Sequence, residues 1–309
     1  MFEGIITPIV TPIQRDEKEC VNLEAMKQLV DHLIEKGVSG IFPLGSNGEF
    51  HVLSNQEKMN VAKAVIEQVN GRVPVYVGTG ACSTAETIQL SKQAESLGAD
   101  VLSVITPYFL KPTDEELIQH YTQVAASVKI PIILYNIPKA TGVNISVSVL
   151  KEMSKVDNIY GIKDSSGDLD NLKGYIEAVE GTKINVLVGS DSKILAGYRM
   201  GATGAIAGTS NLITDTLVGL DQAYRAGEFE KAQKLQQDIE ELRKVLPLGT
   251  VLSILKRAVE MAGIAEVGPA RKAWWFNHQQ RKVPHGETEV FDKEFKRFNG
   301  LVDELRLLL

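Results

Sequence analysis

Cysteine is scarce in this chain of 309 residues and occurs only at positions 20 and 82. Two cysteines are too few for a disulfide framework or a cysteine-based zinc site. Histidine is also sparse, and its five residues show no metal-binding spacing such as H-E-x-x-H. The sequence therefore predicts neither a disulfide-stapled fold nor a metal centre.

A large excess of one charge and long apolar runs are absent as well. The net charge is −6 and no basic stripe occurs, so nucleic acid and anionic membranes are poor partners. No apolar run approaches the roughly 20 residues that span a bilayer. The first residues lack the basic segment and apolar core of a signal peptide. We expect a cytoplasmic protein.

Short apolar runs rich in valine and isoleucine alternate with longer amphipathic stretches. The runs do not alternate in polarity, which is typical of parallel strands buried on both faces. The eight predicted strands cover residues 4–11, 40–44, 73–78, 101–105, 131–136, 159–163, 184–188 and 204–207. Eight strand–helix units predict an α/β protein with a TIM (β/α)8 barrel. A doubly wound open sheet, the alternative, uses fewer strands and a glycine-rich first turn.

After the eighth strand–helix unit the sequence predicts only helices and no further strands. They cover residues 228–245, 251–261 and 290–308, and their apolar stripes indicate packing on the barrel or on another subunit. The aromatic run at residues 274–276 fits the core of this appendage better than a platform for bases. We therefore expect a catalytic barrel over residues 1–225 and a C-terminal helical region over residues 226–309.

A lysine ends the sixth predicted strand, where a charged residue is unexpected. Lysine is costly to bury, and Asp164 is a poor partner for Lys163 because successive strand residues point to opposite faces. A desolvated lysine supplies the neutral amine that attacks a ketone. Active sites of such barrels lie at the C-terminal ends of the strands. Lys163 is therefore the strongest catalytic candidate.

Other strand ends carry weaker signals. Tyr135 closes the fifth predicted strand, either as a barrel-layer residue or as a proton carrier. The turn at residues 45–49 exposes backbone N–H groups that can cradle a carboxylate, although most such turns are plain connections. Asp191 follows the seventh strand and is well placed as a helix N-cap. The eighth strand ends in small residues that let a ligand approach the backbone.

Three motifs resemble the signatures of the dihydrodipicolinate synthase / N-acetylneuraminate lyase family. They are G-S-N-G-E at 45–49, Y-N-x-P at 135–138 and G-I-K-D-S-S-G-D at 161–168, and the resemblance covers roughly residues 2–300. It implies a class I aldolase or lyase in which Lys163 forms an imine with pyruvate or a 2-keto acid. Tyr135 moves the proton. The imine is the electron sink, so the resemblance implies no metal or organic cofactor.

The resemblance also implies the substrate contacts and the partners. The backbone N–H groups of Ser46 and Asn47, with the Ser46 hydroxyl, hold the pyruvate carboxylate, and Ile206 offers a carbonyl near the imine. The partners are a small 2-keto acid and an aldehyde, and the chain forms a homo-oligomer, usually a tetramer built from dimers. Further predicted substrate-binding residues are Gly48, Ser165, Asp191 and Thr209.

Some positions depart from the family's pattern. Ala140 stands where the lysine-pathway synthase has an aldehyde-binding arginine, and its neighbour Lys139 is expected to point elsewhere. Phe109 replaces a tyrosine that crosses a subunit interface, and Asp191 lacks the following glutamate of sialic acid lyases. These departures favour an aldolase for 2-keto-3-deoxy or 4-hydroxy-2-oxo acids. The alternatives are 4-hydroxy-tetrahydrodipicolinate synthase, which uses aspartate semialdehyde, and a non-catalytic ligand-binding protein.

Overall fold

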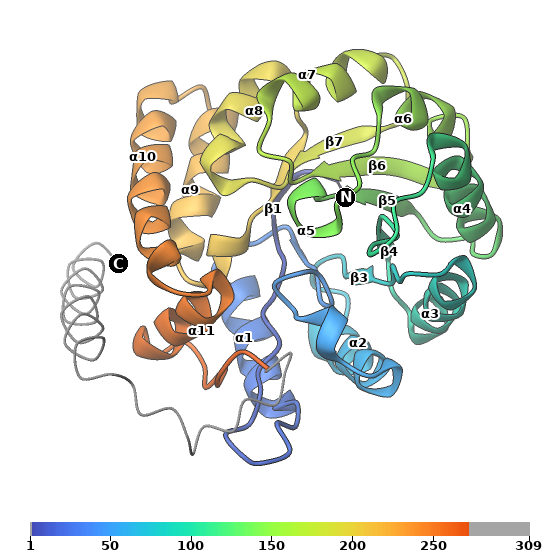
Figure 1. Ribbon diagram of the computed structural model, residues 1–309. Coiled ribbons are helices and arrows are strands. Elements are labelled where there is room, and N and C mark those ends of the chain that lie inside the picture. The colour runs from blue at the N-terminus through green and yellow to red at the C-terminus, as the bar shows by residue number, and fades with distance from the viewer. Residues whose placement is uncertain (1, 272–309) are drawn as a thin grey trace, which may run out of the picture.

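Eight parallel strands surround the centre of the molecule, and helices cover them on the outside (Figure 1). The computed structural model describes residues 2–271. The strands are β1 (Gly4–Thr7), β2 (Gly40–Ile41), β3 (Tyr76–Gly78), β4 (Val101–Ile105), β5 (Ile132–Asn136), β6 (Ile159–Asp164), β7 (Asn185–Val188) and β8 (Gly204–Ile206).

The strand order closes the sheet into a barrel. It runs β2-β1-β8-β7-β6-β5-β4-β3, with all pairs parallel. A parallel bridge between Ile41 and Val75 joins β2 to the beginning of β3. The predicted (β/α)8 barrel is confirmed.

Several helices begin at residues whose side chains cap them. Ser54 and Thr113 form capping boxes with Glu57 and Glu116 at the starts of α2 and α4. The helices are α1 (Leu23–Glu35), α2 (Asn55–Val69), α3 (Thr84–Leu97), α4 (Asp114–Ala126), α5 (Pro138–Thr141), α6 (Val147–Met153), α7 (Leu169–Ala178), α8 (Ile194–Met200), α9 (Thr214–Arg225), α10 (Phe229–Val245) and α11 (Val251–Met261).

Two local features differ from the expectation. The first strand ends at Thr7 rather than at residue 11, because Pro8 has no N–H to donate to the ladder. The short helix α5 was not predicted. Pro138 begins it, and Gly142 ends it with a φ of 73°, a backbone angle that favours glycine.

The C-terminal helices pack on the barrel, one of the two expected positions. α10 lies beside α9, outside the ring of helices (Figure 1). Leu242 of α10 and Leu255 of α11 join the same buried core as the barrel residues. The division at residue 225 stays a proposal, and the predicted helix at 290–308 and the aromatic run at 274–276 lie outside the described residues. Within residues 2–271, no helix is long and apolar enough to cross a membrane.

Candidate active site

A cavity of about 250 Å³ lies at the C-terminal ends of the strands, where barrel enzymes place their chemistry. A larger hollow of about 720 Å³ beside Arg15 and Glu260 is lined by none of the predicted site residues. The cavity at the strand ends is therefore the candidate active site. Eight of the nine predicted residues line it: Ser46, Asn47, Tyr135, Lys163, Ser165, Asp191, Ile206 and Thr209.

Lys163 lies deep in this cavity and is only 3% exposed. Its partner in the register between β5 and β6 is Tyr135. The Nζ atom lies 3.9 Å from the centre of the Tyr135 ring and 5.1 Å from that of Phe42. Among the described residues, no carboxylate lies within ion-pair distance of this amine. The amine is therefore enclosed by aromatic faces and left available to a ligand.

The Tyr135 hydroxyl connects the lysine to the glycine-rich turn. Its Oη lies 3.1 Å from Oγ of Ser46, so the two hydroxyls share a hydrogen bond. Phe42 packs edge-on against the tyrosine ring at 6.2 Å between centroids and so holds the ring in place. A proton can therefore pass between the reacting centre and the turn along two adjoining hydroxyl groups.

The turn at residues 45–49 presents unused donors. Gly48 donates its N–H to the carbonyl of Gly45 at 3.0 Å, and Glu49 donates to the carbonyl of Ser46 at 3.2 Å. Within residues 2–271, the N–H groups of Ser46 and Asn47 have no acceptor. Two adjacent free amides are suited to a carboxylate. Gly48, the ninth predicted residue, closes the turn and does not line the cavity.

Ser165 and Asp191 both bind the backbone. Oγ of Ser165 donates to the carbonyl of Gly189 at 3.3 Å. A Cβ on Gly189 would lie 2.1 Å from the Ser165 Oγ. The Asp191 carboxylate accepts from the N–H groups of Gly208 at 3.1 Å and Thr209 at 2.7 Å. Asp191 thus ties β7 to the turn after β8. Substrate binding by these two side chains stays a proposal.

The turn after β8 completes the far wall of the cavity. The Asn47 amide lies over Gly208, where a Cβ would come within 2.5 Å of Nδ2. Ile206 ends β8 and is buried. Oγ1 of Thr209 is buried and has no hydrogen-bond partner among the described residues. Since buried hydroxyls are ordinarily paired, this one is suited to a bound ligand.

The prediction that Lys139 points away from the site is wrong. Lys139 lines the cavity, and its Nζ lies 3.8 Å from the position of a Cβ built on Gly167. The turn of helix in α5 is the reason, because it changes the direction of the chain directly after β5. Arg243 of α10 lines the same cavity. Sequence reasoning missed it, since nothing local indicates that α10 reaches the strand ends.

Asn136 and Asp164 were also missed, although both stand inside the motifs. They are buried, and Nδ2 of Asn136 donates to Oδ1 of Asp164 at 2.9 Å. Oδ1 of Asn136 accepts from the N–H of Ile145 at 3.0 Å, and Asp164 accepts from the Ser166 hydroxyl at 2.8 Å. This network fixes the ends of the two strands that carry the catalytic candidates. Their position next to Tyr135 and Lys163 was the available signal.

A metal site is not found in the described part of the chain. There, no group of three or more histidine, cysteine, aspartate or glutamate residues is placed to hold an ion.

Known proteins resemble this chain over nearly its whole length. The dihydrodipicolinate synthetase family matches residues 1–279. A 4-hydroxy-tetrahydrodipicolinate synthase from Methanoculleus marisnigri is 37% identical over 271 residues, covering 88% of this chain and 92% of its own. A dihydrodipicolinate synthase structure from Bacillus anthracis has a TM-score of 0.85 and 31% identity, covering 96% and 98% of the two chains. One from Acinetobacter baumannii, complexed with pyruvate, has a TM-score of 0.83 and 33% identity over 96% and 98%.

The fold and the enclosed lysine define the class of the protein. It is a carbon–carbon lyase of the class I type, which forms a Schiff base with pyruvate. The chain belongs to the dihydrodipicolinate synthetase family. The resemblance inferred from the three motifs is confirmed.

Proposed function

We propose that this protein is a pyruvate-dependent aldolase that reversibly adds pyruvate to an aldehyde or cleaves a 4-hydroxy-2-oxo acid, such as a 2-keto-3-deoxy sugar acid. One observation carries the proposal. The Lys163 amine lies beside the Tyr135 ring, and the Tyr135 hydroxyl adjoins the turn whose Ser46 and Asn47 amides are free. The arrangement supplies a nucleophile, a proton carrier and a carboxylate cradle in one cavity.

The reaction follows from the roles of these groups. The pyruvate carboxylate accepts hydrogen bonds from the Ser46 and Asn47 amides, which brings its ketone carbon to Lys163. The amine adds to that carbon, and loss of water leaves the imine. The Tyr135 hydroxyl gives its proton to the hydroxyl group that leaves as water, and the resulting phenolate takes a proton from the methyl carbon to give the enamine. The enamine attacks the aldehyde and forms the carbon–carbon bond. Tyr135 delivers the proton to the new alkoxide, and water then hydrolyses the imine.

No metal or organic cofactor has a part in these steps. The protonated imine withdraws electrons from the neighbouring carbon, which is the task that a metal or an organic cofactor performs in other enzymes.

Borohydride trapping tests the proposal directly. Reduction in the presence of pyruvate is expected to add one reduced pyruvate unit to the intact mass of the wild type. Lys163→Ala should abolish the adduct. Lys183→Ala, which removes a lysine exposed outside the cavity, should retain it. An adduct that survives in Lys163→Ala would overturn the role proposed for Lys163. A wild type without an adduct would overturn the proposal as a whole and favour a non-catalytic ligand-binding protein.

A second candidate is 4-hydroxy-tetrahydrodipicolinate synthase, the name of the relative from Methanoculleus marisnigri. The observation that favours it is the pair of cations in the cavity, Lys139 and Arg243. Neither has an ion-pair partner within residues 2–271, and Asp191, the carboxylate nearby, already accepts two backbone N–H groups. Such cations suit an aldehyde that carries a carboxylate, as aspartate semialdehyde does.

A substrate panel separates the two candidates. The assay compares pyruvate consumption with aspartate semialdehyde, glyceraldehyde and other hydroxylated aldehydes. A kcat/KM that is highest for aspartate semialdehyde and falls in Lys139→Met supports the synthase. A preference for uncharged hydroxylated aldehydes that is unchanged in Lys139→Met supports the aldolase.

The proposal includes a cytoplasmic homo-oligomer, a tetramer built as a dimer of dimers. It is supported by two apolar side chains in the loop between β4 and α4. Phe109 is 92% exposed and Leu110 is 77% exposed in the single chain. Apolar side chains that protrude together from a surface are typical of interfaces.

A further inference from the structure

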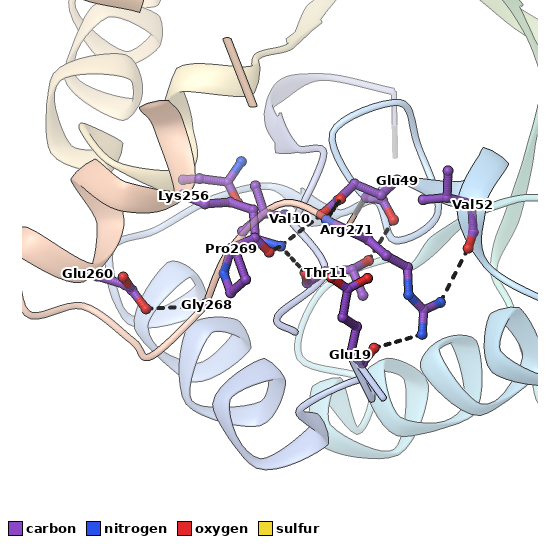
Figure 2. Close-up of polar contacts among 12 residues, drawn as sticks. Val10, Thr11, Glu19, Glu49, Val52, Lys256, Glu260, Gly268, Pro269 and Arg271 are labelled. Carbon is purple, nitrogen blue, oxygen red and sulfur yellow. Dashed lines mark hydrogen bonds and ion pairs between the residues drawn. The ribbon is translucent and has the colours of Figure 1, made fainter. Parts of the chain in front are cut away.

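A buried ion pair connects the C-terminal helical region to the carboxylate turn. Lys256 of α11 is 0% exposed and Glu49, the last residue of the turn, is 1% exposed. Nζ of Lys256 lies 2.8 Å from Oε1 of Glu49. Figure 2 shows this pair together with the segment that follows α11. The two residues are separated by 207 positions in the sequence.

Lys256 uses all of its donors at this place. Besides Glu49, its Nζ donates to the carbonyl of Thr11 at 2.8 Å and to that of Pro269 at 2.6 Å. The second carboxylate oxygen of Glu49 accepts from the N–H of Arg271 at 2.5 Å. An ammonium group has three N–H donors, so the ion is fully hydrogen-bonded. One side chain therefore joins three separate segments of the chain (Figure 2).

The same contacts restrain the geometry of the turn. Glu49 has a φ of 56° and Leu44 a φ of 63°, so two residues other than glycine hold the left-handed conformation at the turn's two ends. Such a conformation is unfavourable for L-residues and persists where surrounding contacts enforce it. The hydroxyl of Thr11 donates to the carbonyl of Gly48 at 2.7 Å. Lys256 thus holds the strained turn directly through Glu49 and indirectly through Thr11, which binds Gly48.

Arg271 extends the connection to the start of α2. Its guanidinium donates to the carbonyls of Val52 and Glu19 at 3.2 and 2.7 Å and to the carboxylate of Glu57 at 2.6 Å. Figure 2 shows the guanidinium beside Val52 and Glu19. The segment after α11 is therefore bound both to the turn and to the helix that follows it.

Neither Lys256 nor Glu49 lines the cavity, whereas Leu255, the neighbour of Lys256 on α11, does. The ion pair therefore has no direct contact with a substrate in the cavity, and its own link to the substrate-binding groups runs through Glu49 and the turn. A buried ion pair is an expensive way to stabilise a fold, because apolar residues of similar size often stabilise it as well or better. Stability alone is therefore a weak reason for a buried ion pair at this place.

We propose that Lys256 and Glu49 are positioning residues that aim the Ser46 and Asn47 amides at the substrate carboxylate. The C-terminal helical region thereby sets the affinity for pyruvate. This inference rests on the proposed function, in which those amides hold pyruvate. It extends that function by assigning a role to two residues outside the cavity.

Three variants test the inference against a purely structural role. Lys256→Met removes the ammonium and leaves Glu49 buried without it. The double variant Glu49→Gln/Lys256→Met removes both charges and relieves that penalty. Arg257→Gln is the matched control, since Arg257 is the next residue on α11 and forms an exposed ion pair with Glu260 at 3.4 Å. For each variant, Tm, the pyruvate dependence of borohydride trapping and the trapping rate at saturating pyruvate are measured.

We expect the variants to change the affinity for pyruvate but not the rate of trapping at saturating pyruvate. Lys256→Met should lower Tm and the double variant should recover much of it. In both, the pyruvate concentration for half-maximal trapping should rise about tenfold, as expected when a charge-assisted hydrogen bond is misaligned. The saturated trapping rate should stay within about twofold of the wild type, since Lys163 is untouched. Arg257→Gln should match the wild type throughout.

The outcomes separate the two proposals. If the wild type traps pyruvate but the double variant recovers both Tm and wild-type pyruvate affinity, the ion pair is only structural and the inference fails. A half-maximal concentration that rises equally in Arg257→Gln also overturns it. If the wild type itself traps no pyruvate, the proposed function fails and the inference falls with it.

Discussion

Lys163 and Tyr135 show how the chemistry depends on single residues. In the proposed mechanism the lysine carries the covalent step, while the tyrosine hydroxyl, 3.1 Å from the Ser46 hydroxyl, moves the proton. Their motifs identified both residues in the sequence. The aromatic ring of Phe42 beside the amine was not anticipated, because Phe42 follows β2 and is distant from Lys163 in the sequence.

Removal of the tyrosine hydroxyl tests the proton step. We expect Tyr135→Phe to lower kcat by about 10²- to 10⁴-fold, the usual contribution of a positioned acid or base. The packing against Phe42 should remain, so Tm should change little. Tyr224→Phe is the control, because Tyr224 donates its hydroxyl to the carbonyl of Tyr198 away from the cavity. Wild-type kcat in Tyr135→Phe would exclude the assigned role.

The unpaired hydroxyl of Thr209 gives a prediction about substrate recognition. We expect Thr209→Val to raise KM for a hydroxylated 2-keto acid by about 3- to 10-fold, because one neutral hydrogen bond is lost. Trapping of pyruvate, which has no such hydroxyl, should be unchanged. Thr106→Val is the matched control, since its hydroxyl is also buried and unpaired among the described residues but does not line the cavity. Equal KM values for both variants and the wild type would contradict this role.

At the scale of helices and strands, most elements follow from local pattern. The capping boxes at Ser54 and Thr113 are local features, because each needs only a short polar residue and a glutamate three positions apart. The helix α5 was not, since its four residues are too few to show a period. This short helix matters for the site, because it places Lys139 at the cavity, whereas the sequence predicted that Lys139 points away.

The contact between α3 and α4 gives a prediction about pH. His120 of α4 is buried, its Nδ1 lies 2.9 Å from the hydroxyl of Thr84, and burial lowers its pKa from 6.5 to about 4. Between these two pH values the unfolded chain binds a proton that the folded protein does not. The contribution of His120 to the free energy of unfolding is therefore fully present above pH 6.5. It is lost as the pH falls towards 4, by up to about 1.4 kcal/mol per pH unit.

Thermal unfolding across that range measures the effect. The Tm of His120→Gln should fall less steeply than that of the wild type between pH 6.5 and 4. His51→Gln is the control, since His51 is exposed, and its curve should run parallel to that of the wild type. Parallel curves for His120→Gln as well would mean that His120 ionises normally in the folded protein.

At the scale of the whole molecule, the exposed loop between β4 and α4 predicts how copies assemble. We expect the wild type to run as a tetramer in mass photometry and Phe109→Asp/Leu110→Asp to run as a smaller species, because charges oppose burial of this loop. Met200→Asp, at the end of α8, should keep the wild-type mass. A double variant of unchanged mass would exclude the loop from the interface, and a monomeric wild type would overturn the proposed tetramer.

The sequence by itself determined the barrel, the lysine and most of the cavity wall. Parallel strands in a barrel end on one face, so counting eight apolar runs was enough to bring Ser46, Tyr135 and Lys163 together. Local pattern carried this information because strand order in such a barrel follows chain order. The same reasoning located Asp191 and Thr209 at the ends of their strands.

Only the tertiary structure decided which groups outside those strand ends act on the site. Arg243 and Leu255 reach the cavity from the C-terminal helices, and Lys256 pairs with Glu49 from the other end of the chain. Such contacts depend on how α10 and α11 lie against the barrel, which no local spacing encodes. The buried charges of Lys256 and Glu49 become intelligible only as a pair, because each would be costly to bury alone.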